Sequence, residues 1–178
     1  MKELAATAGQ DEDTVSYLLG LLICYPLGIV MNLLPYGKLK HAFSFILGVF
    51  LLQFSLGVQW IHQLITSLVA YAMFAMLPQG TSKWLVPTFA MVCMSVAHLH
   101  RQFINYLGYD MDFTGAQMVL TMKLYSISYN LYDGYLIKNN LLSENPKEDR
   151  ATRKCSTFAV QELPSLIEFL GYTFCFSN

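Results

Sequence analysis

Residues 41–58 read HAFSFILGVFLLQFSLGV, the most apolar run of the chain. This run opens a longer stretch, His41 to Ser82, whose 42 residues carry no formal charge. The hydrocarbon core of a bilayer is about 30 Å thick and takes roughly 20 helical residues to cross. The stretch is therefore too long for one crossing. It predicts two membrane-spanning helices joined near the polar residues 59–63.

Acidic residues are absent from a still longer part of the sequence. The 96 residues from Thr14 to Tyr109 contain no Asp or Glu, although the whole chain has 12. Charged residues make up 13% of the chain, against about 25% in ordinary soluble domains. A soluble core of this size needs a charged outer face, and this sequence does not supply one. The composition predicts a protein surrounded by lipid.

Further apolar runs lie on both sides of the central stretch. Residues 15–34 form a 20-residue run without a charge, and residues 84–97 form a shorter run that contains Pro87. The predicted fold class is all-α, a polytopic transmembrane helical protein with about four to five spans. Residues 1–14 are predicted to form a polar N-terminal arm.

A fifth helix is predicted from Gly115 to about Tyr132. Thr114 and Gln117 have the T-x-x-Q spacing of a capping box, and Asp133-Gly134 is expected to end the helix. One face is apolar, with Leu120, Leu124, Ile127 and Leu131. Two polar stripes flank it, the first with Gln117, Thr121, Tyr125, Ser128 and Tyr132, the second with Lys123, Ser126 and Asn130. Because lipid alone would not accommodate two polar stripes, this helix is expected to pack against other helices or to line a wet cavity.

The last part of the chain alternates between hydrophilic and apolar. Residues 139–156 carry charges of both signs and are predicted to form a loop. Residues 157–178 are apolar but contain Glu162, Pro164 and Glu168, which predicts a re-entrant or interfacial segment. Eight basic residues lie in the loops after the first, third and fifth helices, and two lie on the opposite side. The excess of basic residues predicts that the former loops face the cytosol.

The residues by themselves assign no catalytic or metal site. Lys123 inside the fifth helix is either a functional buried charge or a side chain that extends toward the headgroups, and both alternatives stay open. His98 and His100 point about 200° apart on a helix and therefore could not share one metal ion. Asp110, Asp112 and Asp133 flank the fifth helix and are expected to be solvated ends or caps.

Two sequence blocks resemble a known enzyme family. Residues 112–134, DFTGAQMVLTMKLYSISYNLYDG, resemble the signature region of the membrane-bound O-acyltransferases, closest to the branch that acylates lysophospholipids. Residues 159–178, AVQELPSLIEFLGYTFCFSN, resemble the segment that follows in those enzymes. The resemblance covers Arg101 to Asn178, and the first hundred residues agree with the family only in hydrophobicity. Residues 15–178 are therefore expected to be the N-terminal, incomplete part of such a domain.

The resemblance implies an activity and a set of binding positions. It implies a lysophospholipid O-acyltransferase that remodels phospholipids in the endoplasmic reticulum membrane, with acyl-CoA as co-substrate and no bound cofactor. The positions that match the signature, expected to contribute to substrate binding, are Gln117, Thr121, Lys123, Asn130 and Asp133. No His or Asn of this chain matches the family's catalytic positions. No catalytic residue is therefore assigned, and a truncated, catalytically incomplete form is expected.

Two other functions stay open. The chain is alternatively a non-enzymatic membrane partner or regulator of a full-length relative, or a small transporter that uses the fifth helix as a pore wall. The net charge of −1, without a basic patch interleaved with aromatic residues, predicts no nucleic-acid partner. The expected partners are the lipid bilayer, a lysophospholipid, acyl-CoA and, as an open alternative, other membrane proteins.

Overall fold

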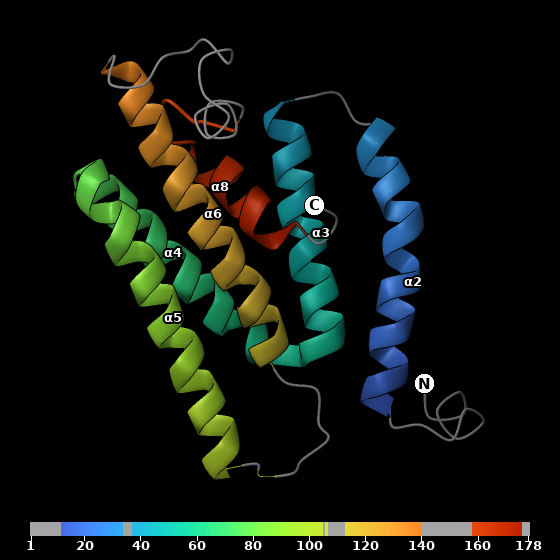
Figure 1. The fold of residues 1–178 in the computed structure, drawn as a ribbon. Helices are drawn as coiled ribbons and strands as arrows, with labels where there is room; N and C mark the ends of the chain where they lie inside the picture. The colour runs from blue at the N-terminus through green and yellow to red at the C-terminus, as the bar shows by residue number, and fades with distance from the viewer. Residues whose placement is uncertain (1–11, 34–36, 105, 107–112, 140–157, 176–178) are drawn as a thin grey trace, which may run out of the picture.

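The protein is a bundle of helices. The computed structural model describes residues 12–33, 37–104, 106, 113–139 and 158–175, and every regular element within these residues is a helix. The α-helices are α2 (Glu12–Leu33), α3 (Lys38–Leu56), α4 (Trp60–Met76), α5 (Gln79–Ile104), α6 (Thr114–Lys138) and α8 (Leu166–Phe174). The five long helices run alternately up and down, and the short α8 lies between α3 and α6 (Figure 1). The predicted all-α class is confirmed.

The uncharged central stretch forms a helical hairpin. A single turn of 3₁₀ helix, η1 (Gly57–Gln59), separates α3 from α4. Gly57 has φ 59°, a left-handed conformation that glycine adopts without strain. The two predicted helices are therefore present, joined two residues earlier than expected.

One helical segment in the described part of the chain, Leu39–Met76, is long and apolar enough to cross a membrane. This segment is the α3–α4 hairpin, and only 22% of its most apolar stretch is buried in the protein. The core helix of a soluble protein would be mostly buried. The larger number of four to five crossings stays a prediction.

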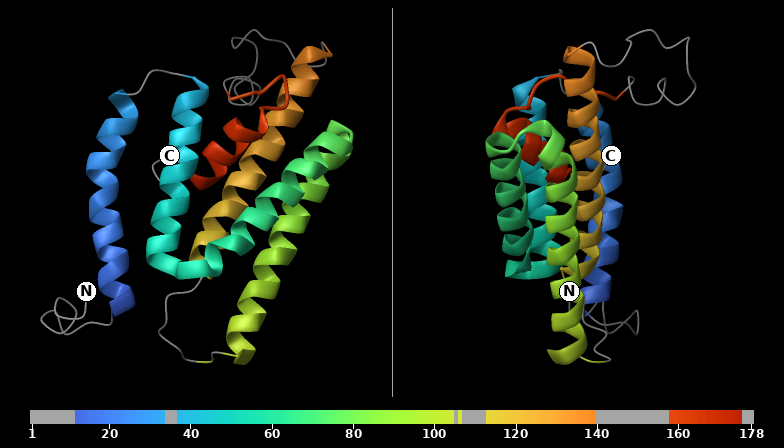
Figure 2. Two further views of the ribbon diagram at one scale, coloured as in Figure 1. Left: turned by 180° about the vertical axis from the view of Figure 1, so that it is seen from behind. Right: turned by 60° about the vertical axis from the view of Figure 1, so that its left-hand side comes forward.

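Small residues let α8 approach α3 closely. A Cβ atom on Gly48 would lie 2.1 Å from the carbonyl oxygen of Phe174, and one on Gly171 would lie 2.7 Å from that of His41. The Ser44 hydroxyl donates to the carbonyl of Gly171 at 3.0 Å. Such contacts between small residues are typical of helix pairs in membranes, where the packing of backbones replaces the hydrophobic effect. Seen from behind and from the side, α8 remains against α3 (Figure 2).

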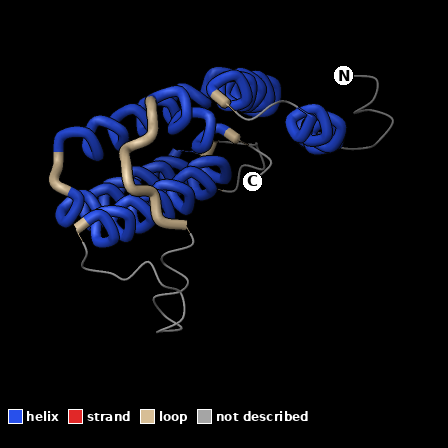
Figure 3. Tube along the Cα trace, turned by 90° about the horizontal axis from the view of Figure 1, so that it is seen from above, coloured by secondary structure: helices blue, strands red, loops and turns tan. Residues whose placement is uncertain are grey.

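The core lies between α4, α5, α6 and α8. The predicted apolar face of α6 is buried there, with each of its four side chains at most 7% exposed. Its partners from the other helices are Ala70, Phe74, Val86, Ala90, Phe169 and Phe174. By contrast, among the described helices α2 contacts only α3, and it stands at the edge of the bundle (Figure 3).

Two predicted helix ends are wrong. The α5 helix does not end near Ala97 but continues through the polar residues to Ile104. The α6 helix passes through Asp133-Gly134 and ends at Lys138. Gly134 is needed inside this helix because a Cβ there would lie 2.0 Å from the carbonyl oxygen of Val160. The glycine makes room for a crossing segment and does not stop the helix.

The outer surface of the bundle is apolar. Large hydrophobic side chains are exposed on every long helix, among them Leu22 at 71%, Ile46 at 66%, Phe50 at 61% and Val92 at 56%. The interior instead contains many polar side chains, namely Ser44, Gln63, Thr66, Ser67, Ser82, Thr114, Gln117, Thr121, Ser128 and Thr173. The core still contains the apolar cluster described above, so the unusual feature is the apolar outer surface, which water solvation does not select.

Candidate functional site

The first polar stripe of α6 turns inward. Gln117 is 2% exposed and Thr121 is 4% exposed. The Thr121 hydroxyl donates to the carbonyl of Gln117 at 2.8 Å, one turn earlier in the same helix. The Gln117 side chain has no hydrogen-bond partner for either its amide oxygen or its amide nitrogen. A buried amide without partners is costly. Among the described signature residues, Gln117 is therefore the one with a fully buried side chain whose polar atoms have no hydrogen-bond partner.

The predicted capping box at the start of α6 is wrong. The helix begins at Thr114, and its N-cap residue makes no side-chain capping bond. Thr114 is buried, and its hydroxyl accepts a hydrogen bond from the guanidinium of Arg101 at 3.4 Å. The threonine is therefore directed to α5 rather than to its own helix end. This leaves Gln117 free of the capping role that its spacing predicted.

Two polar side chains of α4, Gln63 and Ser67, are also buried. The amide oxygen of Gln59 accepts from the backbone N–H of Phe113 at 3.0 Å, which brings the starts of α4 and α6 to one level. The two helices run in the same direction from there (Figure 1). Gln63 and Gln117 each come four residues after this contact, so they lie at similar depth. The Gln63 amide nitrogen and the Ser67 hydroxyl are also buried without a hydrogen-bond partner. We call Gln63, Ser67, Gln117 and Thr121, buried polar residues that this register places at similar depths on α4 and α6, the amide cluster.

The Lys123 side chain contacts the C-terminal end of α8. Its ammonium donates to the carbonyls of Tyr172 at 3.0 Å and Thr173 at 3.5 Å, and it also contacts the carbonyl of Cys175. These carbonyls end α8, where backbone acceptors lack helical partners and the helix dipole is negative. Lys123 thus caps α8 inside the protein and does not extend to the headgroups. It is not the only charge of α6, because the longer helix also contains Asp133 and Lys138.

Asn130 lies where a C-terminal segment crosses α6. We call residues 158–165 the strap. The backbone N–H of Val160 in the strap donates to the carbonyl of Asn130 at 3.0 Å, next to the close approach at Gly134. The side chains of Asn130 and Asp133 are half-buried. An ion pair between Lys138 and Glu162 at 3.8 Å also joins helix and strap, but its side chains are 60% and 84% exposed, so it adds little stability.

The five signature residues do not converge on one pocket. Gln117 and Thr121 belong to the amide cluster, Lys123 caps α8, and Asn130 and Asp133 lie near the strap. The sequence placed the first four of them on one helix and Asp133 at its end, and in the structure all five lie on α6. The sequence did not show which neighbouring helix or segment each face of α6 would contact.

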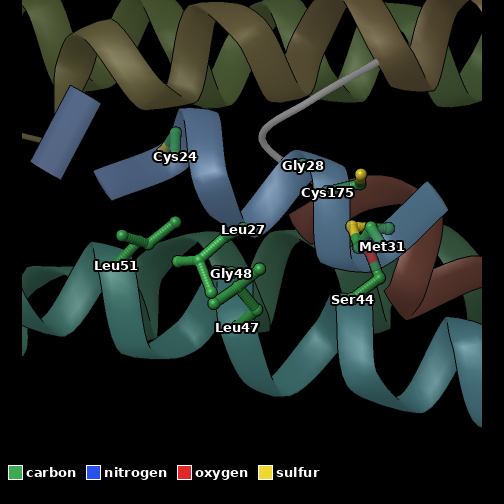
Figure 4. Close-up of a pocket in the computed structure, with 9 residues that line it drawn as sticks. All are labelled: Cys24, Leu27, Gly28, Met31, Ser44, Leu47, Gly48, Leu51 and Cys175. Carbon is green, nitrogen blue, oxygen red and sulfur yellow. The ribbon is translucent and has the colours of Figure 1, made fainter. Parts of the chain in front are cut away.

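Neither of two cavities in the described structure is lined by these residues. A cavity of about 10 Å³ lies between α2 and α3, beside Gly28, Gly48 and Cys175 (Figure 4). It has room for about one water molecule and none for a substrate. A second, open cavity of about 310 Å³ lies at the strap, and its lining includes Tyr135 and Lys138. Its volume falls in the range of small-molecule sites.

The other sequence candidates fall into two groups. His98 is half-buried with an unpartnered Nε2 atom, and His100 is exposed on the same helix. Within the described residues no group of three His, Cys, Asp or Glu side chains is placed to hold a metal ion. Asp110 and Asp112 lie outside the described residues, as does most of the predicted loop 139–156.

One structural signal in the sequence was missed. Ser165 and Glu168 form a complete capping box at the start of α8, in which the backbone N–H of Ser165 donates to the Glu168 carboxylate at 2.9 Å. The S-x-x-E spacing of this pair was visible in the sequence. It places Glu168 in a capping role rather than at a catalytic position.

Comparison with known proteins gives a consistent set of relatives. No family model matches the chain. Mouse membrane-bound glycerophospholipid O-acyltransferase 2 is 28% identical over 136 residues, which is 76% of this chain and 24% of the mouse protein. Lysophospholipid acyltransferase 2 of Arabidopsis thaliana is 29% identical over 98% of this chain and 36% of its own length. This chain is a homologue of lysophospholipid acyltransferases.

The acyltransferase likeness extends further than the sequence blocks indicated. The lysophospholipid acyltransferase of Schizosaccharomyces pombe is 29% identical over 96% of this chain and 32% of its own length. The alignment therefore includes the first hundred residues as well. The chain spans about a quarter to a third of the length of these relatives.

Proposed function

We propose that this chain supplies the first helices of a lysophospholipid O-acyltransferase, which transfers an acyl group from acyl-CoA to the hydroxyl of a lysophospholipid in the endoplasmic reticulum membrane. The observation that carries the proposal is the alignment of acyltransferases along 96–98% of the chain. A short local match would be compatible with a shared helix alone. An alignment through all the described helices supports a shared architecture.

The distribution of side chains supports a position within the bilayer. Exposed leucine, isoleucine and phenylalanine side chains surround an interior with ten buried polar side chains. Helices α2 to α6 have 17 to 26 residues. At 1.5 Å per residue these lengths are about 25–40 Å, close to the roughly 30 Å of hydrocarbon. We infer that all five helices cross the membrane.

The alternation of helix directions supports one orientation. The C-terminal ends of α2, α4 and α6 lie at the same end of the bundle (Figure 1). The basic residues Lys83 and Lys138 are at this end, and the sequence of residues 140–157 adds four more. An excess of basic residues marks the cytosolic side. Acyl-CoA, a hydrophilic molecule, would reach the protein from that side.

The amide cluster is the part of the bundle best suited to substrate. Acyl transfer to a hydroxyl requires groups that orient the hydroxyl and the thioester carbonyl. The unpartnered amide of Gln117 offers both a donor and an acceptor in a site from which water is excluded. Thr121 and Lys123 are already engaged within the protein. We assign them to positioning of the helix and Gln117 to contact with substrate.

The test is acyl transfer in isolated membranes. Membranes that contain the protein expressed from its complete coding sequence are supplied with radiolabelled acyl-CoA and lysophosphatidylcholine. The expected product is labelled phosphatidylcholine, and it should decrease when acyl-CoA is omitted. The absence of any labelled phospholipid with all lysophospholipid classes would contradict the proposal.

The 178 residues expressed alone are the matched comparison. We expect no turnover from them, because no His or Asn in them matches the family's catalytic positions. Turnover by these residues that is lost on His98→Ala would show that the chemistry lies within the described helices. That outcome would overturn the assignment of a supporting role to this part of the bundle.

A further inference from the structure

A lysine on α5 lies within a group of aromatic rings. The ammonium of Lys83 is 3.8 Å from the ring centroid of Tyr132, 5.1 Å from that of Trp84 and 6.0 Å from that of Tyr129. Trp84 and Tyr129 are in edge contact at 6.2 Å. We call Trp84, Tyr129 and Tyr132 the aromatic cage. Such contacts between a cation and ring faces are electrostatically favourable.

The cage is held at a fixed place between two helices. The hydroxyl of Ser128 on α6 donates to the backbone carbonyls of Ser82 at 3.3 Å and Lys83 at 3.1 Å. This fixes the backbone of Lys83 against α6, one residue before Tyr129. The spacing of Tyr129 and Tyr132 places both rings on the face of α6 next to α5. The positions of the cage residues are therefore set by the packing of α5 against α6 and not by a loop.

The charge of Lys83 is not neutralised within the described structure. No carboxylate among the described residues forms an ion pair with it, whereas Lys138 pairs with Glu162. A lysine ammonium has three N–H donors, and those that do not face a ring can donate to an oxygen anion. The cage is also open to the exterior, because Trp84 is 63% exposed and Lys83 is half-buried.

The position of the cage corresponds to the headgroup layer. Tryptophan and tyrosine gather at that depth in membrane proteins. Under the proposed orientation, Lys83 lies near the cytosolic end of α5. A choline phospholipid presents there a phosphate, which requires a cation with N–H donors, and a trimethylammonium group, which aromatic rings bind. Lys83 and the cage offer both components side by side.

We propose that Lys83 and the aromatic cage form a binding site for a phosphocholine headgroup. The ammonium of Lys83 turns from the rings to the phosphate, and the trimethylammonium group takes its place against Tyr132, Trp84 and Tyr129. One cation leaves the rings and another enters, so the charge at the cage is conserved. The inference rests on the proposed function for the lipid surroundings of this site. It adds a headgroup class that the homology does not specify.

The test measures lysolipid binding to the purified chain in maltoside micelles, without acyl-CoA. Radiolabelled lysophosphatidylcholine is compared with lysophosphatidylglycerol, which has the phosphate but no ammonium. We expect tighter binding of lysophosphatidylcholine. Tyr132→Leu should weaken that binding roughly tenfold and leave lysophosphatidylglycerol nearly unaffected. Tyr132→Phe keeps the ring and should bind like the unaltered chain, whereas Lys83→Met should weaken both lysolipids.

Matched controls separate the site from general effects. Tyr25→Leu removes an exposed tyrosine of α2, and Lys138→Met removes a cation at the same end of the bundle; neither should alter lysophosphatidylcholine binding. If Tyr132→Leu lowers the melting temperature, Trp84→Leu provides the same comparison at an exposed position. Equal affinity for both lysolipids that no ring substitution changes would overturn the proposal.

Competition with unlabelled diacyl phosphatidylcholine identifies the source of the headgroup. Effective competition indicates a bilayer lipid, and weak competition indicates the lysophospholipid substrate. Either result supports a phosphocholine site. Because binding is measured without acyl transfer, this experiment can succeed or fail independently of the acyltransferase assay.

Discussion

At the scale of single residues, a few positions allow one segment of backbone to pack closely against another. Gly134 leaves room for the strap to cross α6, and Gly48 and Gly171 leave room for α8 to pack on α3. Lys123 caps the C-terminal end of α8. Each of these contacts joins segments far apart in the sequence. Their loss would affect the bundle more than the loss of an average apolar contact.

Gly134→Ala tests the crossing of the strap. The new Cβ would lie 2.0 Å from the carbonyl oxygen of Val160, a backbone atom that can move only with the strap. Overpacking of this kind costs about 1–3 kcal/mol, so the melting temperature in detergent should fall. Gly115→Ala in the same helix is the control, because a Cβ there meets nothing within 4 Å. A higher helix propensity should make that variant neutral or slightly more stable.

Gln117→Met tests whether the amide cluster is kept for a ligand. The substitution replaces an unpartnered buried amide with an apolar side chain of similar size. Relief of a desolvation penalty of about 1–3 kcal/mol should raise the melting temperature of the chain. Gln102→Met, at an exposed position of α5, should change it little. A lower melting temperature for Gln117→Met would mean that the amide has a structural partner.

At the scale of elements, the ends of α8 are fixed from both sides. Its N-terminus has a capping box within the chain segment itself, and its C-terminus is capped by Lys123 from α6. With nine residues the helix is too short to be stable alone. Its stability therefore depends on these caps and on burial against α3.

Ser165→Ala removes the N-terminal cap. Loss of an N-cap side chain costs about 0.5–2 kcal/mol. Hydrogen exchange of backbone amides in residues 166–170 should become faster, while that of α4 remains unchanged. Ser95→Ala provides the comparison, because this exposed serine bonds only to the carbonyl of Met91 in its own helix. Unaltered exchange in Ser165→Ala would indicate that packing on α3 alone holds the helix.

Lys123→Met removes the C-terminal cap of α8 while keeping most of the apolar stem. Hydrogen bonds to charged groups contribute about 1.5–3 kcal/mol, so residues 171–175 should become more accessible to protease. Lys138→Met removes an exposed ion pair instead and should have little effect. Equal protease accessibility in the two variants would argue against the capping role.

The sequence predicted the helices but not their partners. Apolar runs and the leucine spacing in α6 identified the elements and the core face, because burial and periodicity are local properties. Gly134 was taken as a helix end because the strap that it admits comes 26 residues later. The carbonyls that Lys123 contacts are 49 or more residues away in the sequence, so no local pattern could indicate them. The amide cluster likewise required the neighbouring position of α4.

At the scale of the whole molecule, the outer surface is more apolar than that of a typical soluble protein. Large apolar side chains face outward on all five long helices, and hydroxyl and amide groups lie beside the apolar core inside. Without a hydrophobic effect between helices in lipid, such bundles are stabilised by close packing and internal hydrogen bonds. The contacts at Ser44, Ser128 and Lys123 are of this kind.

Phe50→Lys tests this arrangement. Phe50 is 61% exposed in the middle of α3. A charge on a water-facing surface would be harmless there, but in the hydrocarbon it costs at least about 2.5–3.5 kcal/mol. The fraction of chain that resists extraction from membranes by alkaline carbonate should therefore fall. Tyr106→Lys, 72% exposed in a turn, is expected to remain membrane-bound. Release of the unaltered chain by carbonate would contradict its position in the bilayer.

The packing of α8 on α3 can form only after both helices have been synthesised. The serine on α3 and the glycine whose carbonyl accepts its hydrogen bond are 127 residues apart. At translation rates of about 5–20 residues per second, the ribosome needs roughly 6–25 s to make the second partner after the first. Throughout that interval α8 does not cover the face of α3 that carries Ser44 and Gly48. A nascent chain would thus depend on the insertion machinery or a membrane chaperone to shield that face until its own C-terminal segment emerges.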